Sequence, residues 1–460
     1  MEQWKSLPGF NSLGDGGGWG KPQYYNTIRT NVIGQDLYVW GRGSSTFHFY
    51  KFDTKNQKWK SLPGIKTLGD EGGWGNPKYY STIRTNVIGQ DLYVWGRGYS
   101  AFHLYKFDTK SQEWIPLPGF DSLGDKEGWG DPKYYSTIQT NVIGQDLYVW
   151  GRGSSKFHLY VFDTKFQDWT SLPGINALSD KEGWDDPKYY STIRTNVIGQ
   201  DLYVWGRGCS TFHFYKFHTQ AQEWIPLPGF SSLSDKGGWG DPKYYSTIRT
   251  NVIGQDLYVW GRGSSTFHFY KFDTQAQQWI SLPGFSSLSD KGGWGKPKYY
   301  STIKTNVIGQ DLYVWGRGSS TFHFYKFDTK SQQWISLPGF NSLGDQGGWG
   351  DPKYYSTLRT NVIGQDLYVW GRGSSTFHFY SYKTKKNIIV PTEKFQNITK
   401  TNYISNLKNS ISGLYHLINL LELETLEGKL ELDEKRIKKL EEMYEIAQNQ
   451  KEYLWELLRK

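Results

Sequence analysis

Sulfur-containing side chains are scarce in this chain. Its 460 residues include one cysteine, Cys209, and two methionines. A single thiol excludes an internal disulfide framework and fits a reducing compartment. Serine occupies the positions 55 residues before and after Cys209. That pattern favours a structural role for this thiol over a reactive one.

Long apolar runs are absent too. No stretch is long and apolar enough to span a bilayer. Met1 is followed by Glu2, Gln3 and Trp4 rather than by a basic segment and an apolar one. We therefore expect no membrane span and no secretory signal. The protein is expected to be cytoplasmic as synthesised, with any export following a non-classical route.

Clusters of lysine and arginine are also missing, although the formal net charge is +9. Residues 386–460 contain equal numbers of basic and acidic side chains, so the surplus is spread over the rest of the chain. Nucleic-acid interfaces usually gather basic charge on one face. We therefore expect no nucleic-acid partner.

Glycine and large aromatic side chains are abundant, and they recur at a fixed interval. The stretch Gly238–Gly263 is repeated with few changes, and its Gly-Arg-Gly arginine returns every 55 residues. A period of this size indicates a solenoid, a propeller or an array. The seven copies of the arginine are Arg42, Arg97, Arg152, Arg207, Arg262, Arg317 and Arg372.

One unit, Ser246–Tyr300, contains the pattern of a propeller blade. Ser-Thr-Ile-Arg-Thr-Asn-Val-Ile is rich in β-formers, and the Tyr-Tyr-Ser-Thr-Ile run is expected to begin the inner strand. Gly254-Gln255 predicts a tight turn before a second strand. An aromatic strand of period two, a second hairpin turn and a short fourth strand follow, and then a long crossing loop. Four short strands and a crossing loop are typical of a propeller blade.

Tryptophan positions predict how the blades close. A tryptophan opens the fourth strand in six units, but the seventh unit ends near Tyr382 without this strand. The missing copy is Gln3–Phe10, at the start of the chain. An N-terminal strand that completes the last blade closes a ring and leaves no exposed sheet edge. The fold class is therefore predicted to be all-β, a seven-bladed β-propeller over residues 1–385.

The last part of the chain departs from the repeat. Residues 386–400 are polar and irregular and are predicted to be a linker. Residues 401–460 carry apolar side chains at steps of three and four, broken at Gly428. These steps predict a C-terminal α-helical hairpin or coiled coil. It could dock on the rest of the chain or form a homo-oligomer, and both alternatives stay open.

The crossing loop and the loop between strands two and three meet on one face of such a ring. Each unit places there an aromatic ring, a carboxylate, a guanidinium and small hydroxyl residues, a combination that suits a sugar. The structural alternative assigns the tryptophans to packing between blades and the arginines to bonds with carbonyls. The seven histidines, His48 and its repeats, have no second ligand at metal spacing, so we expect no metal and no cofactor.

The repeats resemble the Photorhabdus-type seven-bladed propeller lectins in the Gly-Trp, the Asp-Pro-Lys-Tyr-Tyr-Ser-Thr-Ile run, the Gly-Arg-Gly and the aromatic strand. The resemblance covers residues 1–385 and implies several sugar sites near the blade boundaries, with a preference for fucose or modified sugars. It implies that the sites are lined by Trp19, Trp74, Trp129, Trp184, Trp239, Trp294 and Trp349; by Tyr24, Tyr79, Tyr134, Tyr189, Tyr244, Tyr299 and Tyr354; and by the seven arginines.

A second likeness is to a kelch blade, in the stretch from Asp311 to Phe340. It implies the same fold and a protein-interaction scaffold. No unit carries a distinct polar cluster, so we expect no enzyme. The favoured hypothesis is a multivalent, non-enzymatic carbohydrate-binding protein. The alternative is a kelch-like scaffold.

Overall fold

A computed structural model of the full chain describes residues 4–9, 22–43, 47–65, 74, 77–98, 102–119, 129, 132–153, 157–175, 184, 187–208, 212–229, 239, 242–263, 267–284, 294, 297–318, 322–339, 349, 352–373 and 377–384. The chain divides into two compact units, Met1–Thr384 and Lys385–Lys460. The predicted linker 386–400, the predicted helices 401–460 and Cys209 lie outside the described residues.

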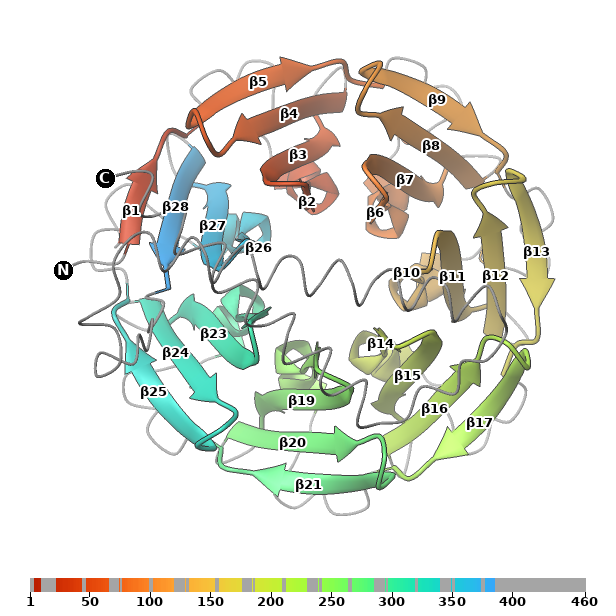
Figure 1. The fold of residues 1–460 in the computed structure, drawn as a ribbon, viewed down its shortest axis with the longest axis vertical. Coiled ribbons are helices and arrows are strands. Elements are labelled where there is room, and N and C mark those ends of the chain that lie inside the picture. The colour runs from red at the N-terminus through yellow and green to blue at the C-terminus, as the bar shows by residue number, and fades with distance from the viewer. Residues whose placement is uncertain are drawn as a thin grey trace, which may run out of the picture. The chain divides into compact units, whose positions relative to one another are not determined.

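Seven four-stranded antiparallel sheets form a ring of blades (Figure 1). This confirms the predicted seven-bladed β-propeller. The inner strands are β2 (Arg29–Ile33), β6 (Arg84–Ile88), β10 (Gln139–Ile143), β14 (Arg194–Ile198), β18 (Arg249–Ile253), β22 (Lys304–Ile308) and β26 (Arg359–Ile363). The second strands are β3 (Asp36–Arg42), β7 (Asp91–Arg97), β11 (Asp146–Arg152), β15 (Asp201–Arg207), β19 (Asp256–Arg262), β23 (Asp311–Arg317) and β27 (Asp366–Arg372).

The outer half of each blade contains the third and fourth strands. The third strands are β4 (Phe47–Asp53), β8 (Phe102–Asp108), β12 (Phe157–Asp163), β16 (Phe212–His218), β20 (Phe267–Asp273), β24 (Phe322–Asp328) and β28 (Phe377–Lys383). The fourth strands are β5 (Lys58–Leu62), β9 (Glu113–Leu117), β13 (Asp168–Leu172), β17 (Glu223–Leu227), β21 (Gln278–Leu282), β25 (Gln333–Leu337) and, for blade 7, β1 (Trp4–Leu7).

Two hairpin turns per blade define what we call the lower face. The predicted inner turn is confirmed: Gly34 has a φ of 62° and joins β2 to β3, as glycine at the first central position of a tight hairpin allows. In the outer turn Gln57 has a φ of 53°. Asp53 Oδ1 accepts a hydrogen bond from the Asn56 N–H and so holds this turn. The opposite face, where the inner strands begin, is the upper face.

The Tyr-Tyr-Ser-Thr segment is a 3-10 helix, and its prediction as the start of the inner strand is wrong. Proline at the first position suits a helix start because its missing N–H costs nothing there. Thr82 Oγ1 then donates to the Tyr79 carbonyl at 2.7 Å, which closes the turn before the strand begins. The helices are η1 (Pro22–Thr27), η2 (Pro77–Thr82), η3 (Pro132–Thr137), η4 (Pro187–Thr192), η5 (Pro242–Thr247), η6 (Pro297–Thr302) and η7 (Pro352–Thr357).

The N-terminal strand closes the ring as predicted. Strand β1 pairs antiparallel with β28, and Trp4 lies opposite Tyr382. The Trp4 indole donates to the Pro338 carbonyl of blade 6 at 2.6 Å. Trp59 makes the same bond to Pro8 of blade 7 at 2.6 Å. Equivalent bonds from Trp114, Trp169, Trp224, Trp279 and Trp334 complete the circle.

The core lies between neighbouring blades rather than inside any one of them. Phe49 of blade 1 packs edge-on against Phe107 of blade 2, with ring centroids 4.7 Å apart. The leucine and the valine of each second strand are buried, as at Leu92 and Val94. Each blade therefore depends on its neighbours for its apolar burial. No helix within the described ranges is both long and apolar enough to cross a bilayer.

Candidate functional site

The six described tryptophans of the Gly-Trp motif lie between neighbouring blades, at the upper end of the boundary. Trp74 lies edge-on to Trp40 of the preceding blade at 5.9 Å, and to Phe47 at 5.9 Å. From its own blade, His103 and Tyr105 cover it at 6.1 and 6.2 Å. We call this set the boundary cluster. Trp74 is completely buried, so its ring faces are occupied by protein.

The Gly-Arg-Gly arginine and the first tyrosine of each unit lie in the same region. The Arg97 guanidinium lies 5.2 Å from the Phe102 ring centroid and 6.0 Å from that of Tyr79. A Cβ at Gly96 would lie 3.1 Å from Trp74 Nε1 and 3.2 Å from Ile83 Cα. The glycine of this motif therefore lets the tryptophan and the 3-10 helix approach the second strand.

All three predicted classes of site residue thus meet, and all are buried. The described tryptophans Trp74, Trp129, Trp184, Trp239, Trp294 and Trp349 are 0% exposed. The tyrosines Tyr24, Tyr79, Tyr134, Tyr189, Tyr244, Tyr299 and Tyr354 are 3–7% exposed, and Arg42, Arg97, Arg152, Arg207, Arg262, Arg317 and Arg372 are 2–5% exposed. Trp19 lies outside the described residues. A sugar could reach these side chains only if the clusters opened, and their role as sugar ligands stays a prediction.

The histidines of the third strands pack against the same tryptophans. The His103 ring lies edge-on to Trp74, and His158 to Trp129 at 6.0 Å. Within the described ranges, no group of three or more His, Cys, Asp or Glu side chains could hold a metal ion.

The lower end of the boundary between blades 1 and 2 is open. A groove of about 510 Å³ lies there, and we call it the lower groove. Its volume lies within the range of small-ligand sites. It is lined by Tyr38, Lys51, Asp53, Asn56, Lys58, Trp59, Lys60 and Leu62 of blade 1 and by Phe107, Thr109 and Gln112 of blade 2. Aromatic carbon and several hydrogen-bonding groups therefore share one concave surface.

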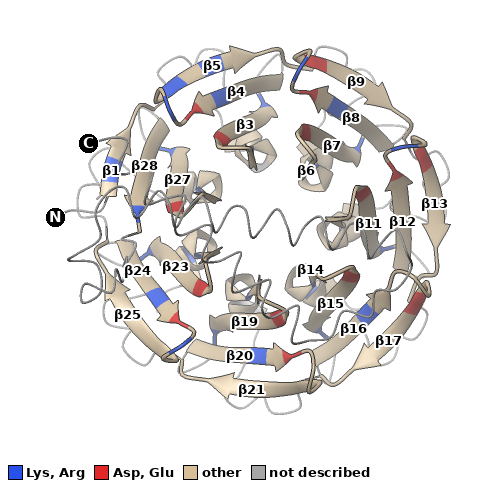
Figure 2. Ribbon diagram, viewed as in Figure 1, with Lys and Arg blue, Asp and Glu red and all other residues tan. Residues whose placement is uncertain are grey.

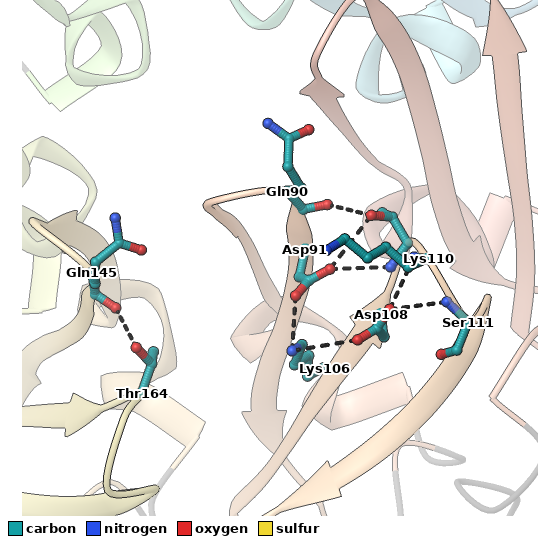
Figure 3. A network of polar contacts seen from close by, with 9 residues as sticks. Gln90, Asp91, Lys106, Asp108, Lys110, Ser111, Gln145 and Thr164 are labelled. Carbon is teal, nitrogen blue, oxygen red and sulfur yellow. Dashed lines mark hydrogen bonds and ion pairs between the residues drawn. The ribbon is translucent and has the colours of Figure 1, made fainter.

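Charge at this end is arranged in fixed pairs. Lys51 Nζ lies 2.6 Å from Asp36 Oδ2, and in blade 2 Lys106 Nζ lies 2.8 Å from Asp91 and 3.7 Å from Asp108 (Figure 3). The hydrogen bond that Lys106 donates to Asp91 raises the pKa of Lys106, against a smaller opposing effect of burial. The backbone N–H groups of Ser111 and Lys110 lower the pKa of Asp108. The raised pKa of Lys106 and the lowered pKa of Asp108 both favour the charged forms of these two groups.

Two boundaries carry an extra lysine that reaches across to the next blade. Lys60 Nζ donates to Gln112 Oε1 at 3.2 Å, and Lys5 Nζ donates to Gln57 Oε1 at 3.1 Å. At the same position the other fourth strands carry Ile115, Thr170, Ile225, Ile280 and Ile335. The boundaries on either side of blade 1 therefore differ chemically from the other five.

A channel of about 650 Å³ runs through the centre of the propeller and is lined by the Thr-Asn-Val residues of all seven inner strands. The residue before each threonine forms what we call the channel-mouth ring: Arg29, Arg84, Gln139, Arg194, Arg249, Lys304 and Arg359. Burial lowers the pKa of Arg84 to about 10, and burial with repulsion from Arg194 lowers that of Arg249 to about 9. Burial and repulsion from Arg249 and Arg359 lower the pKa of Lys304.

The sequence analysis missed both the lower groove and the channel-mouth ring. A signal for the ring was present: a basic residue precedes Thr-Asn-Val-Ile in six units and glutamine does so in the third. The signal for the groove was the departure of Lys5 and Lys60 from the isoleucine or threonine of the other units.

Comparison with known proteins supports the fold and part of the resemblance. No family model matches the chain, so none supports the lectin family. An F-box/kelch-repeat protein of Arabidopsis thaliana is 22% identical over 252 residues, covering 53% of this chain and 54% of that protein. The chain thus spans about half the length of this curated relative. The kelch likeness is supported at the level of a weak homologue.

Solved structures show the same fold in enzymes. A polysaccharide lyase, Uly1, matches with a TM-score of 0.50 and 9% identity, covering 77% of this chain and 89% of the lyase. An oligogalacturonate lyase from Vibrio parahaemolyticus matches with a TM-score of 0.47 and 8% identity, covering 83% and 97%. The prediction that this chain is not an enzyme, which was based on the uniformity of the repeats, is therefore wrong. Identities this low show the fold alone and assign no activity to this chain. The chain is a seven-bladed β-propeller with a weak kelch-repeat homologue.

Proposed function

We propose that this propeller is a carbohydrate-binding protein that holds glycans in the lower grooves on either side of blade 1. The observation that carries this proposal is the open groove between blades 1 and 2, where lysine, aspartate and amide side chains surround the partly exposed ring of Trp59. Sugars present an apolar C–H face and many hydroxyls, and such a surface can meet both.

The Lys60–Gln112 bridge is the feature that a hydroxyl-rich ligand would use. Both side chains have long, exposed stems, so the bridge adds little to stability. Replacing this hydrogen bond by hydrogen bonds to the hydroxyls of a ligand therefore costs little free energy. Because Lys5 and Gln57 repeat the arrangement, the proposal predicts two sites, and two linked sites gain avidity on a dense glycan surface.

A glycan array with the full chain, followed by titration of the best monosaccharide, tests the proposal. The double variant Lys58→Gln with Lys60→Ile gives the fourth strand of blade 1 the sequence that blades 5 and 6 already use, so folding should be unaffected. We expect at least a tenfold loss of affinity in a groove made by Lys60. An array without any sugar bound by the folded protein contradicts the proposal. If the double variant binds the monosaccharide with the same affinity as the wild type, the sugar site does not involve Lys60.

A second candidate, a protein-interaction scaffold, is favoured by the kelch-repeat relative. It predicts a stoichiometric protein partner in a pull-down and no competition by sugars. The two functions separate in one experiment: elution of the captured partner by the best array sugar favours the lectin, and retention of the partner favours the scaffold.

Residues 401–460 are proposed to set the oligomeric state. Deletion of this segment is expected to leave a folded propeller that assembles with fewer chains per oligomer. Light scattering measures the mass of both proteins in solution. A full chain that is already monomeric contradicts the proposal.

A further inference from the structure

The channel-mouth ring gathers six basic side chains at one end of the central channel. Arg29, Arg84, Arg194, Arg249, Lys304 and Arg359 each begin an inner strand. Each directly precedes a threonine that lines the channel. The six residues are half-buried, so each retains some access to solvent. Because seven blades share one axis, these charges face one another around a closed circle.

Backbone carbonyls hold the guanidinium groups in place. Arg84 donates from Nε and Nη2 to the Ile138 carbonyl of the next blade at 3.0 and 2.6 Å. Its Nη1 donates to the Ser81 and Ile83 carbonyls. Arg249 and Arg359 repeat this pattern with Ile303 and Ile28. The carbonyls fix the position of each charge without neutralising it.

Among the described residues, the acidic side chains lie at the lower end of the blades, away from this ring; the aspartates and glutamates of the crossing loops lie outside the described residues. The segment from η2 through β6 contains no aspartate or glutamate, and neither does its counterpart in any other blade. In the described part of the chain, every acidic side chain begins a second strand, ends a third strand or begins a fourth. Figure 2 shows the aspartates at the lower ends of β3, β7, β15 and β19. Within the described residues, the basic side chains of the ring lie close enough to affect one another: repulsion from Arg359 and Arg84 adds to burial in lowering the pKa of Arg29.

We propose that the upper mouth of the central channel binds a compact polyanion of the oligophosphate class, held by the channel-mouth ring. Four of the five N–H groups of Arg84 donate to carbonyls in the described structure, so the ring offers a strong field and few additional donors. Such a site selects for the number of charges on the ligand more than for its hydroxyls. Oligophosphates carry several charges in a small volume.

The chain contains its own control for the substitutions. Gln139 occupies the ring position in blade 3, and β10 pairs with β11 in the same register as in the other blades. Glutamine at this position is therefore compatible with a folded blade. The triple variant Arg84→Gln, Arg249→Gln, Arg359→Gln removes three charges with a side chain that the fold already accepts. Gln139→Arg adds a seventh charge.

Titration calorimetry of the full chain with sodium tripolyphosphate, at constant ionic strength, tests the inference. We expect 1:1 binding, at least a tenfold loss of affinity in the triple variant, and a several-fold gain in Gln139→Arg. Sulfate should bind much more weakly, because it carries fewer charges. The matched control Lys78→Gln, Lys133→Gln, Lys188→Gln removes three exposed cations on the 3-10 helices and should cost less affinity than the triple ring variant.

Three outcomes overturn the inference. The first is no binding of tripolyphosphate at millimolar concentration. The second is equal affinity in the wild type and the triple ring variant. The third is a larger loss in the lysine control than in the ring variant, which would place the anion on the helices. The glycan site involves Lys5 and Lys60 instead, so failure of either proposal leaves the other intact.

Discussion

The two ends of one blade boundary differ in side-chain composition and in burial. At the upper end between blades 1 and 2, Trp74 is fully enclosed by Trp40, Phe47 and Tyr105. At the lower end, Lys60 and Gln112 bridge an open groove. The repeats vary little at the upper end, whereas position 60 is lysine, isoleucine or threonine in different blades.

This contrast separates assembly from recognition. Close packing tolerates little change in volume, because a lost ring leaves a cavity and an added atom has no space. An open polar groove tolerates exchange, because solvent replaces whatever is removed. The upper end therefore joins the blades, and the lower end can differ from boundary to boundary. The following predictions test that division, beginning with the largest effect.

Replacing an upper-end tryptophan should destabilise the propeller most. Trp184→Ala removes a fully buried ring that contacts Trp150, Phe157 and His213. We expect a loss of about 3–5 kcal/mol in the free energy of unfolding, measured by chemical denaturation. The lower-end control Lys60→Ala should change it by less than about 0.5 kcal/mol. Equal losses in the two variants would remove the distinction.

Adding one carbon at the upper end should also be costly. A Cβ at Gly151 would lie 3.2 Å from Trp129 Nε1, Ile138 Cα and Thr137 Oγ1. Gly151→Ala is therefore expected to lower stability by about 1–3 kcal/mol through overpacking, seen as a lower Tm. An unchanged Tm would show that the boundary cluster accommodates the added carbon without strain.

Removing one circumferential hydrogen bond should have a moderate effect. In Trp114→Phe the 2.7 Å bond from the indole to the Pro63 carbonyl is lost, while an aromatic ring remains against Phe49 and Phe107. We expect a loss of about 1 kcal/mol, again from denaturation. A loss as large as that of Trp184→Ala would argue against the proposed order.

The smallest effect concerns a lower-end carboxylate without its usual lysine. Val161 takes the lysine position in blade 3, and burial raises the pKa of Asp146. The ionised form is then disfavoured in the folded state, so its contribution to stability falls as the pH rises from the unfolded pKa, near 4, through the raised folded value. Asp146→Asn keeps an acceptor for the Thr164 N–H. It should gain less than about 1 kcal/mol at pH 7 and nothing at pH 3.

Thermal unfolding at both pH values, beside Asp91→Asn, checks this prediction. The Asp91 variant loses its ion pair with Lys106 and should not gain stability at pH 7. A gain in both variants would assign the effect to the turn rather than to the missing lysine.

The blade count and the ring closure could be predicted because they depend on periodicity and on counting the fourth-strand tryptophans, whose missing copy is Trp4. The 3-10 helices were mistaken for strand because tyrosine and threonine favour strands locally, while Pro77 and the Thr82 hydroxyl decide otherwise. A ring such as Trp74 can serve a ligand or a neighbouring blade, and one sequence does not distinguish these uses. The cation ring depends on sevenfold symmetry, which brings together residues 55 positions apart.

Blade 7 differs from the other six in one further respect: a covalent turn is absent between its third and fourth strands. Trp4 lies opposite Tyr382 in the register that Trp59 and Phe52 adopt in blade 1, where residues Thr54–Gln57 make the connection. A four-residue linker from Lys383 to residue 3 would therefore reproduce a native hairpin. The break could then be moved to the equivalent turn of any other blade. The chain's starting point is thus interchangeable among seven positions, and a set of circular permutants should share one architecture.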